Sequence, residues 1–151
     1  MIWIAANTGK RSLRTINNIA YMYNTMGKYL FSLNKSTKAV DYTYSSKNDT
    51  WTKYITMHYL YSNYMLKRYE EIISFYQVIV FEPKTLISVS AVICILAAYK
   101  ENCMDTVNII KEEFKNDRNV KIILNYIETK NKEILDNLEP TPYLVRIAKQ
   151  L

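Results

Sequence analysis

Few side chains in this sequence have the type and spacing that catalysis or metal binding requires. The chain has one histidine, His58, and two cysteines, Cys94 and Cys103, and neither cysteine has a second cysteine or a histidine at metal-ligand spacing. The acidic pairs Glu70-Glu71 and Glu112-Glu113 fall on predicted helices, where adjacent side chains point in different directions. Two distant glycines cannot build a Gly-rich phosphate loop. The sequence therefore predicts a protein that is not an enzyme and has no cofactor or metal ion.

Composition favours a single all-α domain. With 151 residues, of which 49% are hydrophobic and 23% charged, the chain is long enough to bury a core and too apolar to be disordered. Two glycines and three prolines are too few for the many tight turns of a β protein. The longest apolar run, residues 86–99, is too short to span a membrane, and the first residues lack a signal-peptide pattern. A cytoplasmic protein with reduced thiols and no membrane association is expected.

Helical periodicity of about 3.6 residues continues through almost the whole chain. Gly27, the polar loop 47–50, Glu82-Pro83, residues 116–119 and the pair Pro140 and Pro142 are suitable breaks. Short connections of this kind predict antiparallel neighbours. The expected helices are 12–26, 29–46, 51–66, 68–81, 85–100, 104–115, 119–138 and 142–150.

One helix and turn recur along the chain. Residues 16–29 read INNIAYMYNTMGKY, which places Ile16, Ile19 and Tyr23 on one face of a helix. Small Ala20 would let a second helix approach closely, and Gly27 would allow a sharp turn. Residues 57–83 repeat this order, although the second turn has no glycine and reads as one residue shorter. A third, weaker copy follows, and the spacing is 40 residues from Tyr29 to Tyr69 and 35 from Tyr69 to Met104.

This pattern resembles the tetratricopeptide repeat, and the likeness covers residues 13–115. The resemblance implies stacked antiparallel helical hairpins in a right-handed superhelix. About three hairpins would form repeat units at 13–46, 51–83 and 85–115, with C-terminal capping helices in 119–151. The low-Gly, Lys-, Asn-, Ile- and Tyr-rich style further resembles peptide-sensing regulators of low-GC Gram-positive bacteria and their phages (the RRNPP type). Those proteins bind a short peptide through groove Asn side chains.

A helical-repeat stack offers a concave groove lined by the first helix of each hairpin. The side chains expected to face this groove, and therefore to bind a peptide or protein partner, are Arg14, Asn17, Tyr21, Asn24, His58 and Ser62. An Asn amide can bond the backbone of an extended peptide, and Tyr adds apolar area with a polar tip. In the third unit the equivalent positions are Val92, Leu96 and Tyr99. The predicted function is thus a non-catalytic protein- or peptide-binding module.

Two alternatives remain open at this point. Residues 1–54 carry eight Lys and Arg against two Asp, and a nucleic-acid-binding helical protein could use the basic residues of 10–53. A plain helical bundle is the other alternative, including a viral Bcl-2-like bundle wrapped around the buried run SVSAVICILAAY.

Assembly is a further expectation. Ile2, Trp3 and Ile4 precede the first repeat, and their apolar side chains predict a homodimer through the N-terminal end or packing on the chain's own first hairpin.

Overall fold

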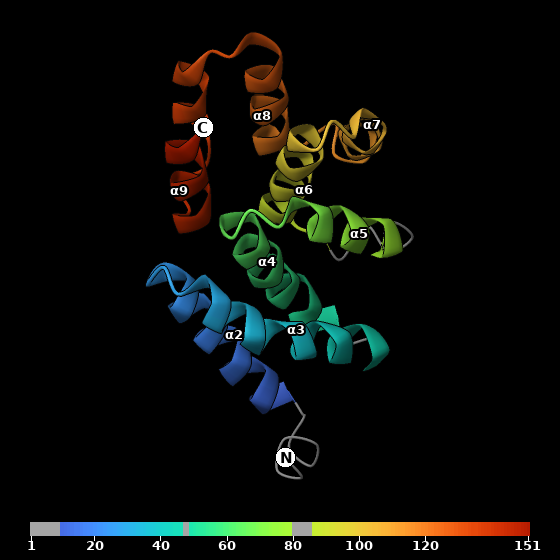
Figure 1. Cartoon of the computed structure of the whole chain (residues 1–151), viewed down its shortest axis with the longest axis vertical. Helices are drawn as coiled ribbons and strands as arrows, with labels where there is room; N and C mark the ends of the chain where they lie inside the picture. The colour runs from blue at the N-terminus through green and yellow to red at the C-terminus, as the bar shows by residue number, and fades with distance from the viewer. Residues whose placement is uncertain (1–9, 47–48, 80–85) are drawn as a thin grey trace. The chain divides into compact units, whose positions relative to one another are not determined.

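The computed structural model describes residues 10–46, 49–79 and 86–151, and within these ranges all regular structure is helical (Figure 1). The predicted all-α class is confirmed. Contacts gather in two compact units, Met1–Lys67 and Arg68–Leu151, where the sequence predicted one domain. The division falls inside the predicted repeat 51–83 because its first helix packs with the preceding helices and its second helix packs with the following one.

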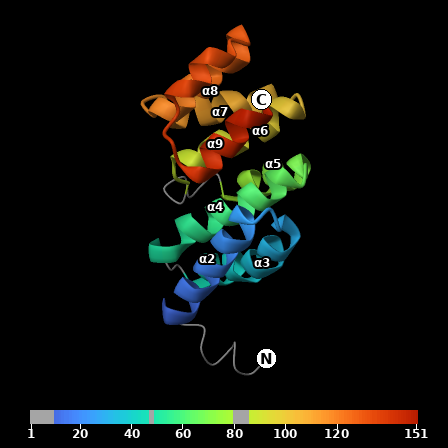
Figure 2. The same cartoon turned by 90° about the vertical axis from the view of Figure 1, so that its left-hand side faces the viewer.

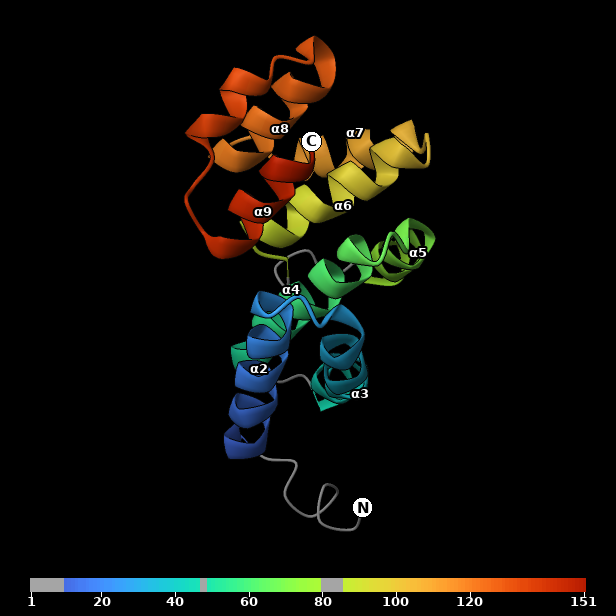
Figure 3. The same cartoon turned by 60° about the vertical axis from the view of Figure 1, so that its left-hand side comes forward.

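The first unit contains α2 (Lys10–Thr25), α3 (Tyr29–Ser46) and α4 (Asp49–Met65). Helices α2 and α3 form a hairpin, and α4 contacts both of them (Figures 2 and 3). The bounds of all three agree with the predicted helices to within two residues. Periodic apolar residues between polar breaks were sufficient to locate them.

Small side chains bring α2 and α3 close together, as predicted for Ala20. Ala20 and Ser32 are fully buried, and the Ser32 hydroxyl donates a hydrogen bond to the Ala20 carbonyl oxygen at 2.8 Å. Leu13, Ile55 and Leu60 are among the other buried core residues of this unit. A larger side chain in place of Ala20 would separate the two backbones and break this bond.

The turns after α2, α4 and α6 share one backbone conformation. Gly27 (φ 76°) donates from its backbone N–H to the Asn24 carbonyl, and Lys28 donates to that of Tyr23, which is the hydrogen-bond pattern of a Schellman motif. Lys67 (φ 61°) and Asn102 (φ 57°) adopt the same left-handed backbone, and the next helix begins two residues later in each case. The second turn is therefore not one residue shorter: Lys67, 40 positions after Gly27, occupies the equivalent place without being a glycine.

The second unit is built around one central helix. Its elements are α5 (Tyr69–Ile79), α6 (Ser88–Lys100), α7 (Met104–Glu113), α8 (Arg118–Thr129), the 3-10 helix η2 (Lys132–Asn137) and α9 (Pro142–Gln150). Residues 89–98 of α6 are all buried, and α6 contacts α5, α7 and α8 (Figure 3).

One predicted helix is broken. The sequence predicted a continuous helix over 119–138, but α8 ends at Thr129 because Lys130 adopts the left-handed conformation (φ 59°). The Asn131 side chain then accepts a hydrogen bond from the Glu133 backbone N–H and caps η2. The apolar spacing continues through the break, so periodicity alone could not reveal it.

Side-chain hydrogen bonds join the beginnings of α6 and α8. The Asp117 carboxylate accepts from the Val120 backbone N–H at 2.9 Å and from the Ser88 hydroxyl at 2.8 Å. Asn119 donates to the Ser88 hydroxyl and accepts from the Glu139 backbone N–H. These bonds place the chain that leads into α9, whose buried face is Tyr143, Leu144 and Ile147.

Several expectations lie outside the described residues. They are the helix end near Pro83, the helix start at 85, and the association of Ile2, Trp3 and Ile4.

Both cysteines are free thiols, and burial raises the pKa of Cys94 to about 12. No helix in 10–46, 49–79 or 86–151 is long and apolar enough to cross a bilayer.

Candidate functional site

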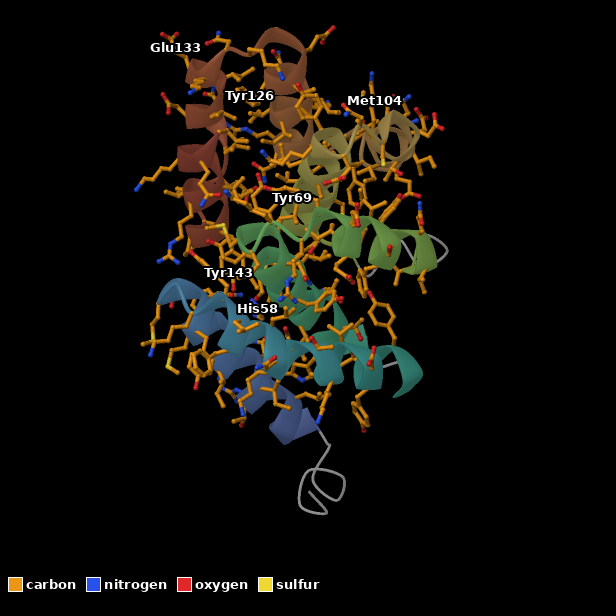
Figure 4. The ribbon with its side chains drawn as sticks, viewed as in Figure 1. His58, Tyr69, Met104, Tyr126, Glu133 and Tyr143 are labelled. Atoms are coloured by element: carbon orange, nitrogen blue, oxygen red, sulfur yellow. The ribbon has the colours of Figure 1, made fainter. Side chains whose placement is uncertain are left out.

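Most of the predicted groove residues of the first two repeat units come together where α4 packs against α2, and Figure 4 labels one of them, His58. Five of them form one set of contacts, which we call the α2–α4 polar network: Asn17, Tyr21, Asn24, His58 and Ser62. The sixth, Arg14, is exposed to solvent on α2. The sequence thus identified residues that are neighbours in space, although they come from two different helices.

Asn24 and Ser62 form the buried half of this network. The Asn24 amide donates to the His58 backbone carbonyl at 3.2 Å. The Ser62 hydroxyl lies 2.8 Å from both the Asn24 side-chain oxygen and the same carbonyl, and its single proton is donated to one of them at a time. Both side chains are fully buried. Since an unpaired buried polar group costs about 1–3 kcal/mol, these bonds fix how α4 lies on α2.

His58 forms the other half. Its Nε2 lies 2.9 Å from the Asn17 side-chain oxygen, and its ring is 5.8 Å from that of Tyr21. Only 2% of the histidine is exposed, and burial lowers its pKa to about 4. The imidazole is therefore neutral at pH 7, and in the tautomer that carries the proton on Nε2 it donates to Asn17.

The network holds helices together and does not activate a nucleophile. Both acceptors of the Ser62 hydroxyl are neutral amide oxygens, which do not remove its proton at neutral pH. The expected open groove is corrected here: Asn24, His58 and Ser62 are buried because the polar faces of α2 and α4 satisfy each other. In the second unit, Val92 and Leu96 are likewise core residues of α6.

A different surface of the same hairpin is exposed and apolar. Ile19, Met22 and Tyr23 follow the spacing i, i+3 and i+4 along α2, and Met26, in the turn directly after α2, continues it at i+7. At about 100° per residue, Met22 points about 200° away from Ala20, so this stripe is separate from the buried face. Phe31 extends it onto α3 by stacking on Tyr23, Leu30 precedes Phe31 in sequence, and Met22, Met26, Leu30 and Phe31 are 46–58% exposed. We call these six residues the Met–Phe surface.

This surface was not predicted from the sequence. Ile19 and Tyr23 were expected on the packing face, whereas both are only half-buried and the helix packs through Leu13, Ala20 and Asn24. The signal was present in the spacing of Met22 and Met26, which continues the stripe of Ile19 and Tyr23. A helix with two apolar faces can bury only one of them inside its own unit.

The Met–Phe surface is ordered by its own contacts and is bordered by positive charge. The rings of Tyr23 and Phe31 stack at a centroid distance of 5.5 Å with 29° between their planes. Lys28 lies in the turn, and Lys35 and Lys38 follow Phe31 by four and seven residues, so they share its side of α3. All three lysines are exposed.

Comparisons with known proteins add no assignment. No profile of a protein family, no curated protein and no solved structure matches this chain. Within the described ranges, no three His, Cys, Asp or Glu side chains are grouped so that they could hold a metal ion. The site consists of a polar network that is buried at Asn24, His58 and Ser62, together with a separate apolar surface that is exposed and bordered by lysines.

Proposed function

We propose that this chain is a non-catalytic protein-binding module that contacts its partner through the Met–Phe surface. The observation that carries the proposal is the cluster of large, exposed apolar side chains on one face of a hairpin that is itself well packed. Scattered exposed apolar residues are ordinary on a protein surface, but a contiguous group of them typically marks an interaction site.

The hairpin is suited to this role because its geometry is fixed before any partner binds. The turn at Gly27, the Ser32–Ala20 hydrogen bond and the α2–α4 polar network all restrain α2. Binding to a rigid surface avoids part of the ordering entropy that a flexible surface would lose. The network thus supports binding indirectly, by positioning α2.

The proposal departs from the peptide-sensing regulators that the repeat resembles. In those proteins Asn side chains in a groove bind the peptide, whereas here Asn24 is fully buried and bonded to α4. We therefore place the partner on the opposite, apolar side of α2. The protein-binding class of function predicted from the repeat is retained, with a different surface.

A photo-crosslinking experiment tests the proposal. A photoreactive phenylalanine analogue would be placed at Met22, at Phe31 or, as a control, at Val78, which is the most exposed apolar side chain of the described residues. We expect a discrete adduct with another protein from positions 22 and 31 in cells that make this chain naturally, and its loss on Met26→Glu. Equal adducts from position 78, or crosslinks only within the chain, would refute the assignment.

A further inference from the structure

We infer that the Met–Phe surface binds an acidic amphipathic helix of its partner protein. This inference rests on the proposed function and specifies the chemistry of the partner. It depends on how apolar and charged side chains are arranged over α2 and α3, which the following steps take in turn.

The apolar part fits a helix. A partner helix presents anchor side chains at i, i+3, i+4 and i+7, and two adjacent helices of a hairpin offer a complementary ridged surface. Met22 lies on α2, Met26 in the turn directly after it and Phe31 on α3, and all three are about half exposed. Methionine side chains are unbranched and polarisable, so they adapt to a partner's shape while the stacked Tyr23 and Phe31 rings give a firmer contact.

The lysines of this surface determine which sign of charge the partner helix should carry. Lys28, Lys35 and Lys38 are exposed beside the apolar side chains, and Asp41 is the acidic residue nearest to them along α3. From Phe31 to Lys38 the helix rises about 10 Å, at 1.5 Å per residue. The surface thus runs from apolar to basic over two turns of α3. A helix with carboxylates next to its apolar face complements this order.

Two other occupants are disfavoured, one by these charges and one by the layout of α2. A second copy of this surface would bring lysines against lysines, and like charges in contact are destabilising. Nor does α2 have the layout of a helix that lies in a bilayer interface, which needs a polar face opposite its apolar one. The face of α2 opposite Met22 is buried against α3 and α4.

The test measures binding of designed peptides by fluorescence anisotropy. One labelled 18-residue peptide carries Leu at i, i+3, i+4 and i+7 with Glu at the flanking positions. A second has the same Leu residues with Lys in place of Glu. We expect the full chain to bind the acidic peptide at least tenfold more tightly than the basic one, with an affinity that falls as salt is added.

Matched variants connect this preference to the surface. Lys35→Glu/Lys38→Glu should weaken acidic-peptide binding at least tenfold and restore binding of the basic peptide, whereas Lys121→Glu, an exposed charge reversal on α8, should change neither. Phe31→Ser should weaken both peptides. Circular dichroism would show that each variant keeps its helices, which is expected because the replaced side chains are exposed.

Three outcomes would overturn the inference: equal affinity for the two peptides, loss of acidic-peptide binding in Lys121→Glu alone, or binding to phosphatidylserine vesicles or duplex DNA with none to the acidic peptide. If the crosslinking at positions 22 and 31 succeeds while the acidic peptide does not bind, only the partner's chemistry is wrong. If neither result is obtained, the proposed function fails as well.

Discussion

The buried histidine gives the first unit a pH-dependent stability that can be calculated from the structure. Burial lowers the pKa of His58 from 6.5 to about 4 in the folded protein. Between these values the unfolded chain takes up a proton that the folded chain does not bind, so folding becomes less favourable as the pH falls. The free energy of unfolding therefore keeps its full value above pH 6.5, as far as His58 is concerned, and decreases progressively as the pH falls to 4.

The magnitude follows from the difference between 6.5 and about 4. At 1.36 kcal/mol for each tenfold change in proton affinity, we expect a loss of about 3 kcal/mol. Carboxylates also titrate near the lower end of this range, so a variant must isolate the histidine. His58→Gln cannot titrate but retains an amide N–H that can reach Asn17.

Tryptophan fluorescence provides the assay. The chain has two tryptophans, Trp3 and Trp51, and in a Trp3→Phe background the remaining one reports on α4, the helix that carries His58. Urea unfolding at pH 7.5, 6.5, 5.5 and 4.5 should show the unfolding free energy falling more steeply in the parent than in His58→Gln.

A direct measurement would refute the reasoning independently of stability. His58 is the only histidine, so its ring proton resonance needs no assignment. A resonance that titrates near pH 6.5 in the folded protein would mean that the ring is hydrated, and parallel pH profiles of the parent and His58→Gln would lead to the same conclusion.

Three further substitutions test the local structure. Gly27→Ala should destabilise the first unit by about 1 kcal/mol, since a side chain at φ 76° is strained although no atom lies within 4 Å of the added Cβ. Lys67→Gly should stabilise the protein by a similar amount. If urea unfolding showed that both substitutions change the unfolding free energy in the same direction, the two turns would not share one conformation. Asp117→Ala should cost about 1–2 kcal/mol through loss of the α8 cap, measured as a lower melting temperature by circular dichroism, and an unchanged melt would show that this cap contributes nothing.

The sequence predicted helix positions well because the signals involved are local. Apolar spacing, Gly27 and the polar breaks each act within a few residues, and α2, α3 and α4 begin and end within two residues of the expected positions. The break at Lys130 was missed for the complementary reason. Its left-handed backbone leaves the apolar spacing intact, and a lysine in the sequence does not predict that conformation as a glycine would.

The site could be predicted only as a set of residues, not as an arrangement. Asn17, Asn24, His58 and Ser62 were selected because they share the polar side of their helices, and such a side can face either solvent or another polar side. Which of these applies depends on α2 and α4 meeting, a contact between residues 34 to 41 positions apart. Once those polar faces bond each other, the apolar stripe of Met22 and Met26 is left outward. Burial of the polar network and exposure of the Met–Phe surface are therefore two consequences of one rotation of α2 about its axis.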